Sequence, residues 1–298
     1  MATLCKIADI DIYMLYYLDI KSVIYVSIVS KNQYELISGL QFVKELKLLK
    51  RGYSQIIDYA SKYNYLTLIK WIDKSINKFI YTKNAIDYAA GNGHIEILDW
   101  FTQASKSGAT GVSENIFKYN TQAINLASKY GRIEVLEWFH KHHGIKYNMD
   151  TIYLASKKGH ISVLEWFRQE YNLENKNESV NKLMYDVKAI NGASRKGHIN
   201  VLEWFDKYNY KFLYDYCAID NACINGYVKV LNWFHNSKHE FKYSERAIGN
   251  ASKHGHISIL EWFEKSQYKI KYTSYAKKYA ANNDILEWFK RIEEKTTA

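Results

Sequence analysis

The sequence predicts an all-α solenoid of about eight helix–turn–helix units, and three observations support this fold class. One phrase, A-I-x-x-A-[SA]-x-x-G-H-I-x-[VI]-L-x-W-F, recurs along the chain. All eight tryptophans occupy the same place in that phrase, at intervals of 26 to 38 residues. The apolar residues on either side of its glycine follow helical spacing. A phrase that recurs every ~20–50 residues is typical of stacked supersecondary units, so we expect the function to reside in the surface of a scaffold.

The first half of each unit is predicted to be a short helix that ends at a glycine. In the unit 85–101, Ala85, Ile86, Ala89 and Ala90 fall on one face, and their small size lets a neighbouring helix approach closely. Gly93 follows, at a place just past a helix end where positive φ is often needed. The same place is held in other units by Asn64, Gly131, Gly159, Gly197, Gly226 and Gly255.

The second half of each unit is predicted to be a helix with a wide apolar stripe. Ile95, Leu98 and Phe101 are three residues apart, and Ile97 and Trp100 repeat that spacing, so burial on two sides is expected. We expect one indole per unit to be shielded by the next unit along the chain. The aligned units are 56–72, 85–101, 123–139, 151–167, 189–205, 218–234, 247–263 and 276–289. The terminal units should be atypical, because one face of each meets water.

A tyrosine lies four residues before each unit from the second onward. These are Tyr81, Tyr119, Tyr147, Tyr185, Tyr214, Tyr243 and Tyr272. Two residues earlier stands an apolar residue, and this period of two indicates a short extended connector. We expect the tyrosines to pack the connector and not to contact a ligand.

The repeated phrase resembles the core of the ankyrin repeat, A-A-x-x-G-H-x-x-[VI]-V-x-x-L-L, over residues 51–298. The resemblance implies stacked helix pairs that bind other proteins. The T-P-L-H opening and the Asp-Gly hairpin tip of that family are absent here, so we doubt that the connectors form projecting β-hairpins. The W-F form, together with a composition rich in Lys, Asn, Ile and Tyr, resembles the ankyrin repeat proteins of giant DNA viruses of protists. This implies a host protein as partner and the host cytoplasm as compartment.

Residues 1–50 lack the repeat and allow two interpretations. Their pattern L-x-x-L-D-x-x-S-x-x-x-x-S-x-V-S-K resembles the middle of an F-box, which would imply docking onto a Skp1-like subunit of a ubiquitin ligase while the repeats select the substrate. The matching residues are Leu15, Leu18, Asp19, Ser22, Ser27, Val29, Ser30 and Lys31. A helical cap that covers the first repeat explains the same pattern. We therefore divide the chain into a cap or F-box-like segment, 1–50, and a repeat domain, 51–298.

Composition and motifs argue against several other classes of protein. The three cysteines are too few and too scattered for a disulfide framework, and they fit a reducing, intracellular setting. The most apolar run, 10–29, is interrupted by charges, and no signal-peptide pattern opens the chain, so we expect neither a membrane span nor secretion. The run His140-Lys141-His142-His143 is interpreted as a solvated helix end. With no nucleotide-binding, metalloprotease or hydrolase motif, we expect no catalytic, cofactor or metal site.

Basic side chains collect just before the turn glycines. They are Lys129, Lys157, Lys158, Arg195, Lys196, Lys253 and His254. Stacking would bring them into one stripe on the first helices, which the ankyrin resemblance places on a concave, partner-binding surface. Cations near a helix C-terminus are also favoured by the helix dipole, by about 0.3–1 kcal/mol each, which explains the same pattern without a partner.

For this basic stripe we expect an acidic or phosphorylated peptide or protein surface as the partner, in preference to nucleic acid. The formal net charge of +10 permits such binding without requiring it. Two long polar connectors, 102–122 and 168–188, are the second choice for a contact surface, because insertions in repeat arrays map to one face.

Overall fold

The regular structure of the chain is helical wherever it is described. The computed structural model describes residues 53–75, 81–107, 119–174 and 183–297, and no strand occurs in these ranges. The absence of strands there agrees with the doubt about projecting β-hairpins. The cap or F-box-like segment at 1–50 lies outside the described residues, so both interpretations of it, and the boundary at residue 50, stay predictions. Residues 108–118 and 175–182 of the two long connectors also lie outside these ranges.

Contacts divide the chain into two compact units, Met1–Ala123 and Ile124–Ala298. The first contains the helix pairs α4 (Tyr53–Lys62) with α5 (Leu66–Ser75), and α6 (Lys83–Asn92) with α7 (Ile95–Ser107). The two helices of each pair pack on each other, and α4 packs on α6. α8 (Thr121–Lys129) begins at the end of the first unit and finishes in the second.

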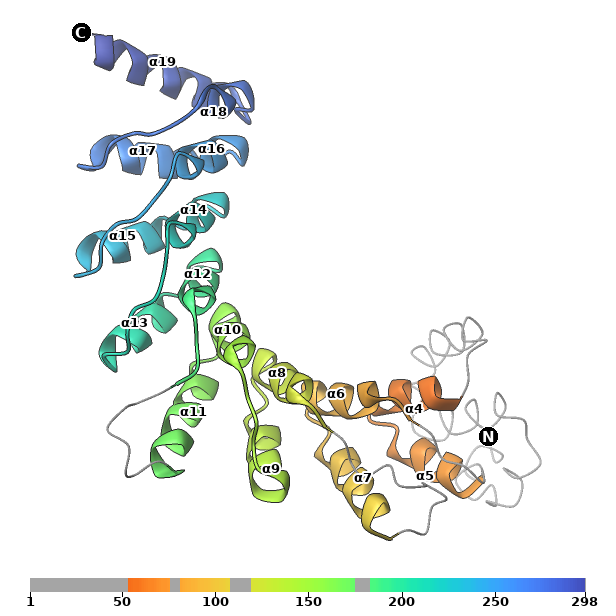
Figure 1. Ribbon diagram of the computed structural model, residues 1–298. Coiled ribbons are helices and arrows are strands. Elements are labelled where there is room, and N and C mark those ends of the chain that lie inside the picture. Colours follow the sequence, from red (N-terminus) through yellow and green to blue (C-terminus); the bar gives the residue numbers. More distant parts are fainter. Residues whose placement is uncertain (1–52, 76–80, 108–118, 175–182, 298) are drawn as a thin grey trace, which may run out of the picture. The chain divides into compact units, whose positions relative to one another are not determined.

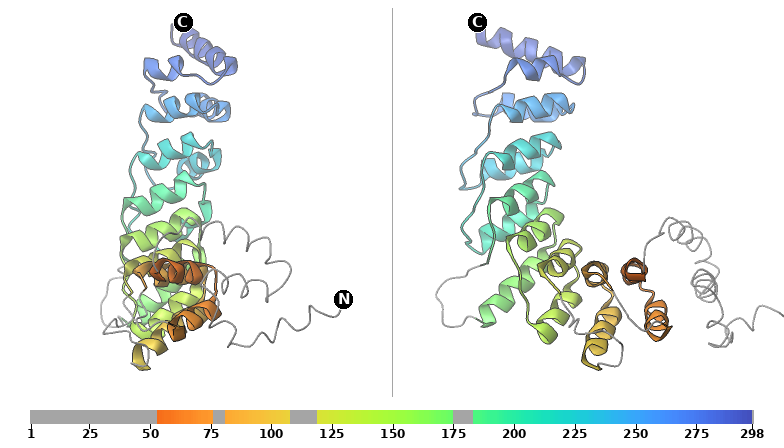
Figure 2. Two further views of the ribbon diagram at one scale, coloured as in Figure 1. Left: turned by 90° about the vertical axis from the view of Figure 1, so that its right-hand side faces the viewer. Right: turned by 45° about the vertical axis from the view of Figure 1, so that its right-hand side comes forward.

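The second unit stacks its helices in two layers. The first-helix layer holds α10 (Met149–Lys158), α12 (Val187–Arg195), α14 (Cys217–Ile224), α16 (Arg246–Lys253) and α18 (Ser274–Lys278). The second-helix layer holds α9 (Ile133–His143), α11 (Ile161–Glu174), α13 (Ile199–Lys207), α15 (Val228–Asn236), α17 (Ile257–Lys265) and α19 (Asn283–Thr297). Within each layer every helix packs on the next in chain order, as Figures 1 and 2 show from three sides. This is a helical repeat solenoid, as the sequence predicts.

The predicted turn residues adopt the predicted backbone. Gly93, Gly159 and Gly255 have φ of 85°, 76° and 78°, and Asn64 at the equivalent place has φ of 61°. At Gly159 the backbone N–H bonds back to the carbonyls of Ala155 and Ser156, which closes the end of α10. The short helices therefore stop where a residue without Cβ strain stands.

The phenylalanine of each W-F pair occupies the centre of the core. Every one of these side chains is at most 2 % exposed: Phe101, Phe139, Phe167, Phe205, Phe234, Phe263 and Phe289. The helix face predicted from Ala85, Ile86, Ala89 and Ala90 is fully buried. Burial of these apolar faces between neighbouring helices is the main force that holds the stack together.

The expectation that each indole is shielded by the next unit is only partly right. Trp138, Trp166, Trp204 and Trp288 are buried, but Trp100, Trp233 and Trp262 are only half-buried. The contacts that fix the indoles reach back to the preceding unit: Nε1 of Trp204 donates to Glu165 at 3.0 Å, and Nε1 of Trp262 donates to Asn232 at 2.6 Å. At Trp204 and Trp262 the polar N–H thus finds an acceptor in the preceding unit, whereas the indole of Trp288 in the last unit is fully buried and its Nε1 has no hydrogen-bond partner among the described residues.

The connector tyrosines pack as expected. The rings of Tyr185, Tyr214 and Tyr243 lie 4.9, 5.1 and 5.2 Å from the phenylalanine rings of their own units. Their hydroxyls donate to the backbone carbonyls of Lys211, Glu240 and Lys269 in the following connector. Each tyrosine thus holds two consecutive connectors side by side.

Two helices and the last unit differ from the regular frame. α7 and α11 continue to Ser107 and Glu174, so the long connectors begin several residues later than predicted. The last unit is atypical, as expected, because α18 has only 5 residues and no turn glycine follows it. Among the described helices, none has both the length and the apolar character needed to cross a bilayer.

Candidate partner-binding surface

A histidine ring ties each of three turns of the second unit to the turn before it. The Nε2 atoms of His160, His198 and His256 lie 3.0, 3.1 and 2.9 Å from the backbone oxygens of Lys129, Lys157 and Ile224. Each oxygen belongs to the last turn of the preceding first helix, where carbonyls have no donor within the helix. A carbonyl can only accept, so Nε2 carries the proton in each ring. These histidines, each of which directly follows a turn glycine, therefore have a structural role.

The turn glycines are required for a second reason besides their positive φ. A Cβ on Gly159 would lie 2.8 Å from Nδ1 of His198, and a Cβ on Gly226 would lie 2.8 Å from Nδ1 of His256. The ring of the next unit therefore rests directly on the turn. Burial in this contact lowers the pKa of His198, since the charged ring would lose hydration there.

A second link between units escaped the sequence analysis. A buried Asp or Asn six residues before the turn bonds a residue one or two positions before the next first helix, or a residue in the first turn of that helix. The pairs are Asp58 with Thr82, Asn125 with Thr151, Asn191 with Asp215, and Asp220 with Ser244. Burial raises the pKa of Asp58 and Asp220, although bonds from Thr82 and Ser244 oppose the rise. The sequence carries a pattern from which this link could have been predicted: Asp or Asn recurs six residues before the turn, and Thr, Asn, Asp or Ser follows each connector tyrosine.

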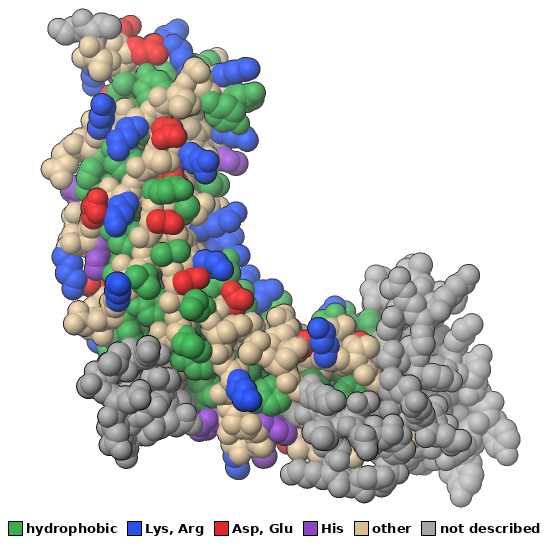
Figure 3. Space-filling view, in the orientation of Figure 1, with side chains coloured by type: hydrophobic (Ala, Val, Ile, Leu, Met, Phe, Trp, Pro, Cys, Tyr) green, Lys and Arg blue, Asp and Glu red, His purple; other side chains and the backbone are tan. Residues whose placement is uncertain are grey.

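These links set the ends of the first helices in a common register, and the predicted basic residues lie there. They lie at the C-terminal ends of α8, α10, α12 and α16 or directly after them, and are referred to below as the basic stripe: Lys129, Lys157, Lys158, Arg195, Lys196, Lys253 and His254. Figure 3 shows lysine and arginine side chains along the edge that the first helices form in the second unit. The equivalent residues of α14 are Ile224 and Asn225, so the basic stripe has one neutral gap.

The cations of the basic stripe have no acidic partners among the described residues, whereas carboxylates of the second-helix layer do. Glu165 pairs with Arg168, which lowers the pKa of Glu165 to about 2, and Asp206 pairs with Lys238 at 3.0 Å. Within the basic stripe, Nζ of Lys157 instead bonds the hydroxyl of Tyr153 at 2.9 Å. An exposed cation without an internal counter-charge is available to an external anion.

A pocket interrupts the first-helix face at the gap in the basic stripe. Its volume is about 520 Å³, and Ile224, Gly249, Asn250, Tyr216 and Tyr275 are among the residues that line it. A Cβ on Gly249 would meet nothing within 4 Å, so this wall is open. Tyr216 and Tyr275 at the flanks are each 47 % exposed. The pocket offers apolar and amide surface beside Ile224, whereas its charged lining residues Glu245 and Arg246 lie at the start of α16, away from Lys253 at the end of that helix.

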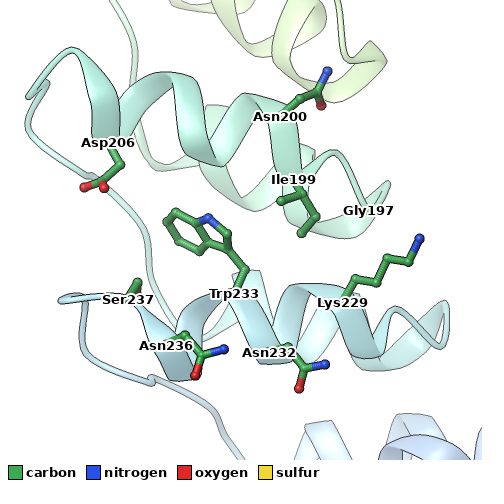
Figure 4. Close-up of a pocket in the computed structure, with 9 residues that line it drawn as sticks. All are labelled: Gly197, Ile199, Asn200, Asp206, Lys229, Asn232, Trp233, Asn236 and Ser237. Carbon is green, nitrogen blue, oxygen red and sulfur yellow. The ribbon is translucent and has the colours of Figure 1, made fainter.

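A larger hollow of about 790 Å³ lies between α13 and α15 in the second-helix layer. Figure 4 shows the Trp233 indole reaching from α15 toward α13, while Asn200, Lys229 and Asn236 point in different directions. Asp206 at its edge is engaged by Lys238 and His239. Because its polar groups do not converge on one point, we do not assign a ligand to this hollow.

Comparison with known proteins does not name a family. No family model matches the chain, and no curated protein matches it. Among solved structures, the chain is similar to the pentatricopeptide repeat protein PPR10 from maize, with 12 % sequence identity and a TM-score of 0.29. That alignment covers 92 % of this chain and 43 % of the maize protein, so the chain spans less than half of its length.

Proposed function

We propose that this chain is a non-catalytic scaffold that binds an acidic segment of another protein along the basic stripe, with the adjoining connectors as a second contact. One observation carries the proposal: the seven basic side chains at the ends of the first helices have no acidic partner among the described residues, whereas Glu165, Asp206 and Glu264 of the second-helix layer are paired with cations. The giant-virus resemblance would make the partner a host protein in the host cytoplasm. The dipole explanation of the same cations remains its rival.

The test compares the basic stripe with a cation outside it. The triple variant Lys157→Gln, Arg195→Gln and Lys196→Gln removes one half-buried and two exposed cations, so a fluorescent acidic peptide should bind about 10–100-fold more weakly. Lys265→Gln is the matched control, because Lys265 is also exposed and also lies in the last turn of a helix, but on α17. Its affinity should stay within about twofold. If the triple variant and the control bind the peptide with equal affinity, the cations only stabilise the C-terminal ends of their own helices and the proposal is contradicted.

Single-stranded nucleic acid is the competing ligand, and one feature of the surface favours it. Tyr130, directly after α8, and Tyr216, directly before α14, are 46 % and 47 % exposed, and exposed aromatic rings can stack on bases. Nucleic-acid binding would lose affinity steeply between about 50 and 200 mM salt. A homopolymeric oligonucleotide that binds more tightly than the acidic peptide at the higher salt would contradict a protein partner.

The F-box-like pattern at 1–50 supports a second role, as a substrate adaptor of a Skp1-containing ubiquitin ligase. In that case the scaffold would present its acidic partner for ubiquitin transfer by other subunits. A pull-down with a purified Skp1-like protein tests this role. Binding that is lost on removal of residues 1–45 supports the adaptor, and no binding by the full chain removes it.

A further inference from the structure

The geometry of the basic stripe points to a partner segment of defined spacing, an inference that rests on the proposed function. We infer that the basic stripe binds a peptide in the polyproline II conformation with the pattern acidic-x-x-acidic-x-x-apolar-x-x-acidic. The acidic residues lie against α10, α12 and α16, and the apolar residue lies over α14. The partner is therefore identified by three carboxylates at regular spacing, with one apolar side chain at the third of the four contact positions.

The spacing follows from how the first helices pack. α10, α12, α14 and α16 contact one another in order, and packed helices lie about 8–10 Å apart. A polyproline II peptide has about three residues per turn and rises about 3.1 Å per residue, so every third side chain returns to the same side after about 9.3 Å. A β-strand places only every second side chain on one side, about 6.6–6.8 Å apart, which does not match the helices. The conformation is thus selected by the repeat distance.

The apolar position follows from the gap in the basic stripe. Ile224 takes the place that Lys157, Arg195 and Lys253 hold in the other helices. Its backbone carbonyl accepts the ring of His256 at 2.9 Å, which fixes the end of α14, and its side chain lines the pocket of about 520 Å³ beside Gly249. Arg246 also lines the pocket, but it lies at the start of α16, whereas Ile224 lies at the end of α14. An acidic side chain placed over Ile224 would therefore lose hydration without a cation of the basic stripe beside it, whereas an apolar side chain would bury surface there.

One cation of the basic stripe is already held in place before any partner binds. The hydroxyl of Tyr153 accepts from Nζ of Lys157 at 2.9 Å, and the ring of Tyr153 lies against Gly192 of α12, where a Cβ would come within 2.9 Å of it. This contact limits the freedom of the lysine, so less entropy is lost when a carboxylate binds.

The experiment measures the binding of synthetic peptides to the full chain by fluorescence anisotropy. The register peptide is E-P-S-E-P-S-L-P-S-E, whose prolines favour polyproline II, and its reversed sequence covers the other chain direction. A shuffled peptide of the same composition carries its three glutamates in a row. The better of the register peptide and its reverse should bind at least about tenfold more tightly than the shuffled peptide.

A change in the gap tests the apolar position separately. Ile224→Lys should reverse the preference at that position, so that a peptide with Glu in place of Leu binds more tightly than the register peptide. Asn225→Lys places a cation in the same gap and keeps Ile224, so it serves if Ile224→Lys does not fold. The control Lys265→Gln should keep the wild-type preference. A preference for Leu that persists in both gap variants overturns the apolar assignment.

The remaining outcomes separate the two proposals. Equal affinity for register and shuffled peptides, lost in the triple variant of the basic stripe, overturns the spacing but keeps an acidic protein partner. If no acidic peptide binds, or if a single-stranded oligonucleotide of equal charge binds more tightly and displaces the peptide, the proposed function and this inference are both overturned.

Discussion

The contact between a turn glycine and the histidine of the next unit makes a quantitative prediction. Gly159→Ala would place a methyl group 2.8 Å from Nδ1 of His198 at a φ of 76°. The left-handed backbone alone costs an alanine about 1–2 kcal/mol. Displacing the ring also breaks its bond to the carbonyl of Lys157, worth about 0.5–1.5 kcal/mol. We expect a total loss of about 1.5–3.5 kcal/mol from these two terms.

Gly255→Ala is the matched control for this substitution. Gly255 has nearly the same φ, 78°, but an added Cβ would meet only Ala281, at an ordinary 3.6 Å. Its cost should therefore be the backbone term alone, about 1–2 kcal/mol. The difference between the two variants isolates the histidine contact.

The assay is urea denaturation followed by circular dichroism, with amide hydrogen exchange over α10–α13 because repeat arrays can unfold unit by unit. In a His198→Ala background the cost of Gly159→Ala should fall to that of Gly255→Ala, which completes a double-mutant cycle. Equal losses for the two glycine variants in the wild-type background would refute the idea that the ring, and not only the backbone, requires glycine.

Three further predictions concern pH and packing. Burial lowers the pKa of His198, so the stability that its neutral ring contributes is present above the ordinary pKa of 6.5 and is lost as the pH falls. Between about pH 7 and pH 5 the free energy of unfolding of the wild type should therefore fall more steeply than that of His198→Gln. The same pH dependence in urea denaturation of both proteins would contradict this. Burial raises the pKa of Asp87 to about 6, so the folded state favours the protonated carboxyl. The stability from this preference is fully present below pH 3.8 and is lost as the pH rises through 6. Asp87→Asn should therefore raise the free energy of unfolding more at neutral pH than at acid pH, and a gain that does not depend on pH would contradict this. Phe205→Ala should cost about 3–5 kcal/mol in urea denaturation and the half-buried Trp233→Ala less, an order that the reverse result would exclude.

The sequence alone determined the elements whose cause is local. The helix pairs and their turns were predictable, because the small-residue face at Ala85–Ala90 and the positive φ at Gly159 depend on residues a few positions apart. The residues of the basic stripe were predictable for the same reason, since each lies next to its own turn glycine. That those cations serve a partner is still a proposal.

The tertiary structure decided everything that depends on which helix lies beside which. The bond from His198 to Lys157 spans 41 residues, and the bond from Ser244 to Asp220 spans 24, so neither partner is implied by its own neighbours in sequence. The acceptors of the indole N–H groups also needed the fold: Glu165 bonds Trp204 and Asn232 bonds Trp262, and each acceptor lies in the preceding unit, 39 and 30 residues away in sequence. The pocket beside Ile224 exists only because α14 packs against α16, which joins residues of three different units.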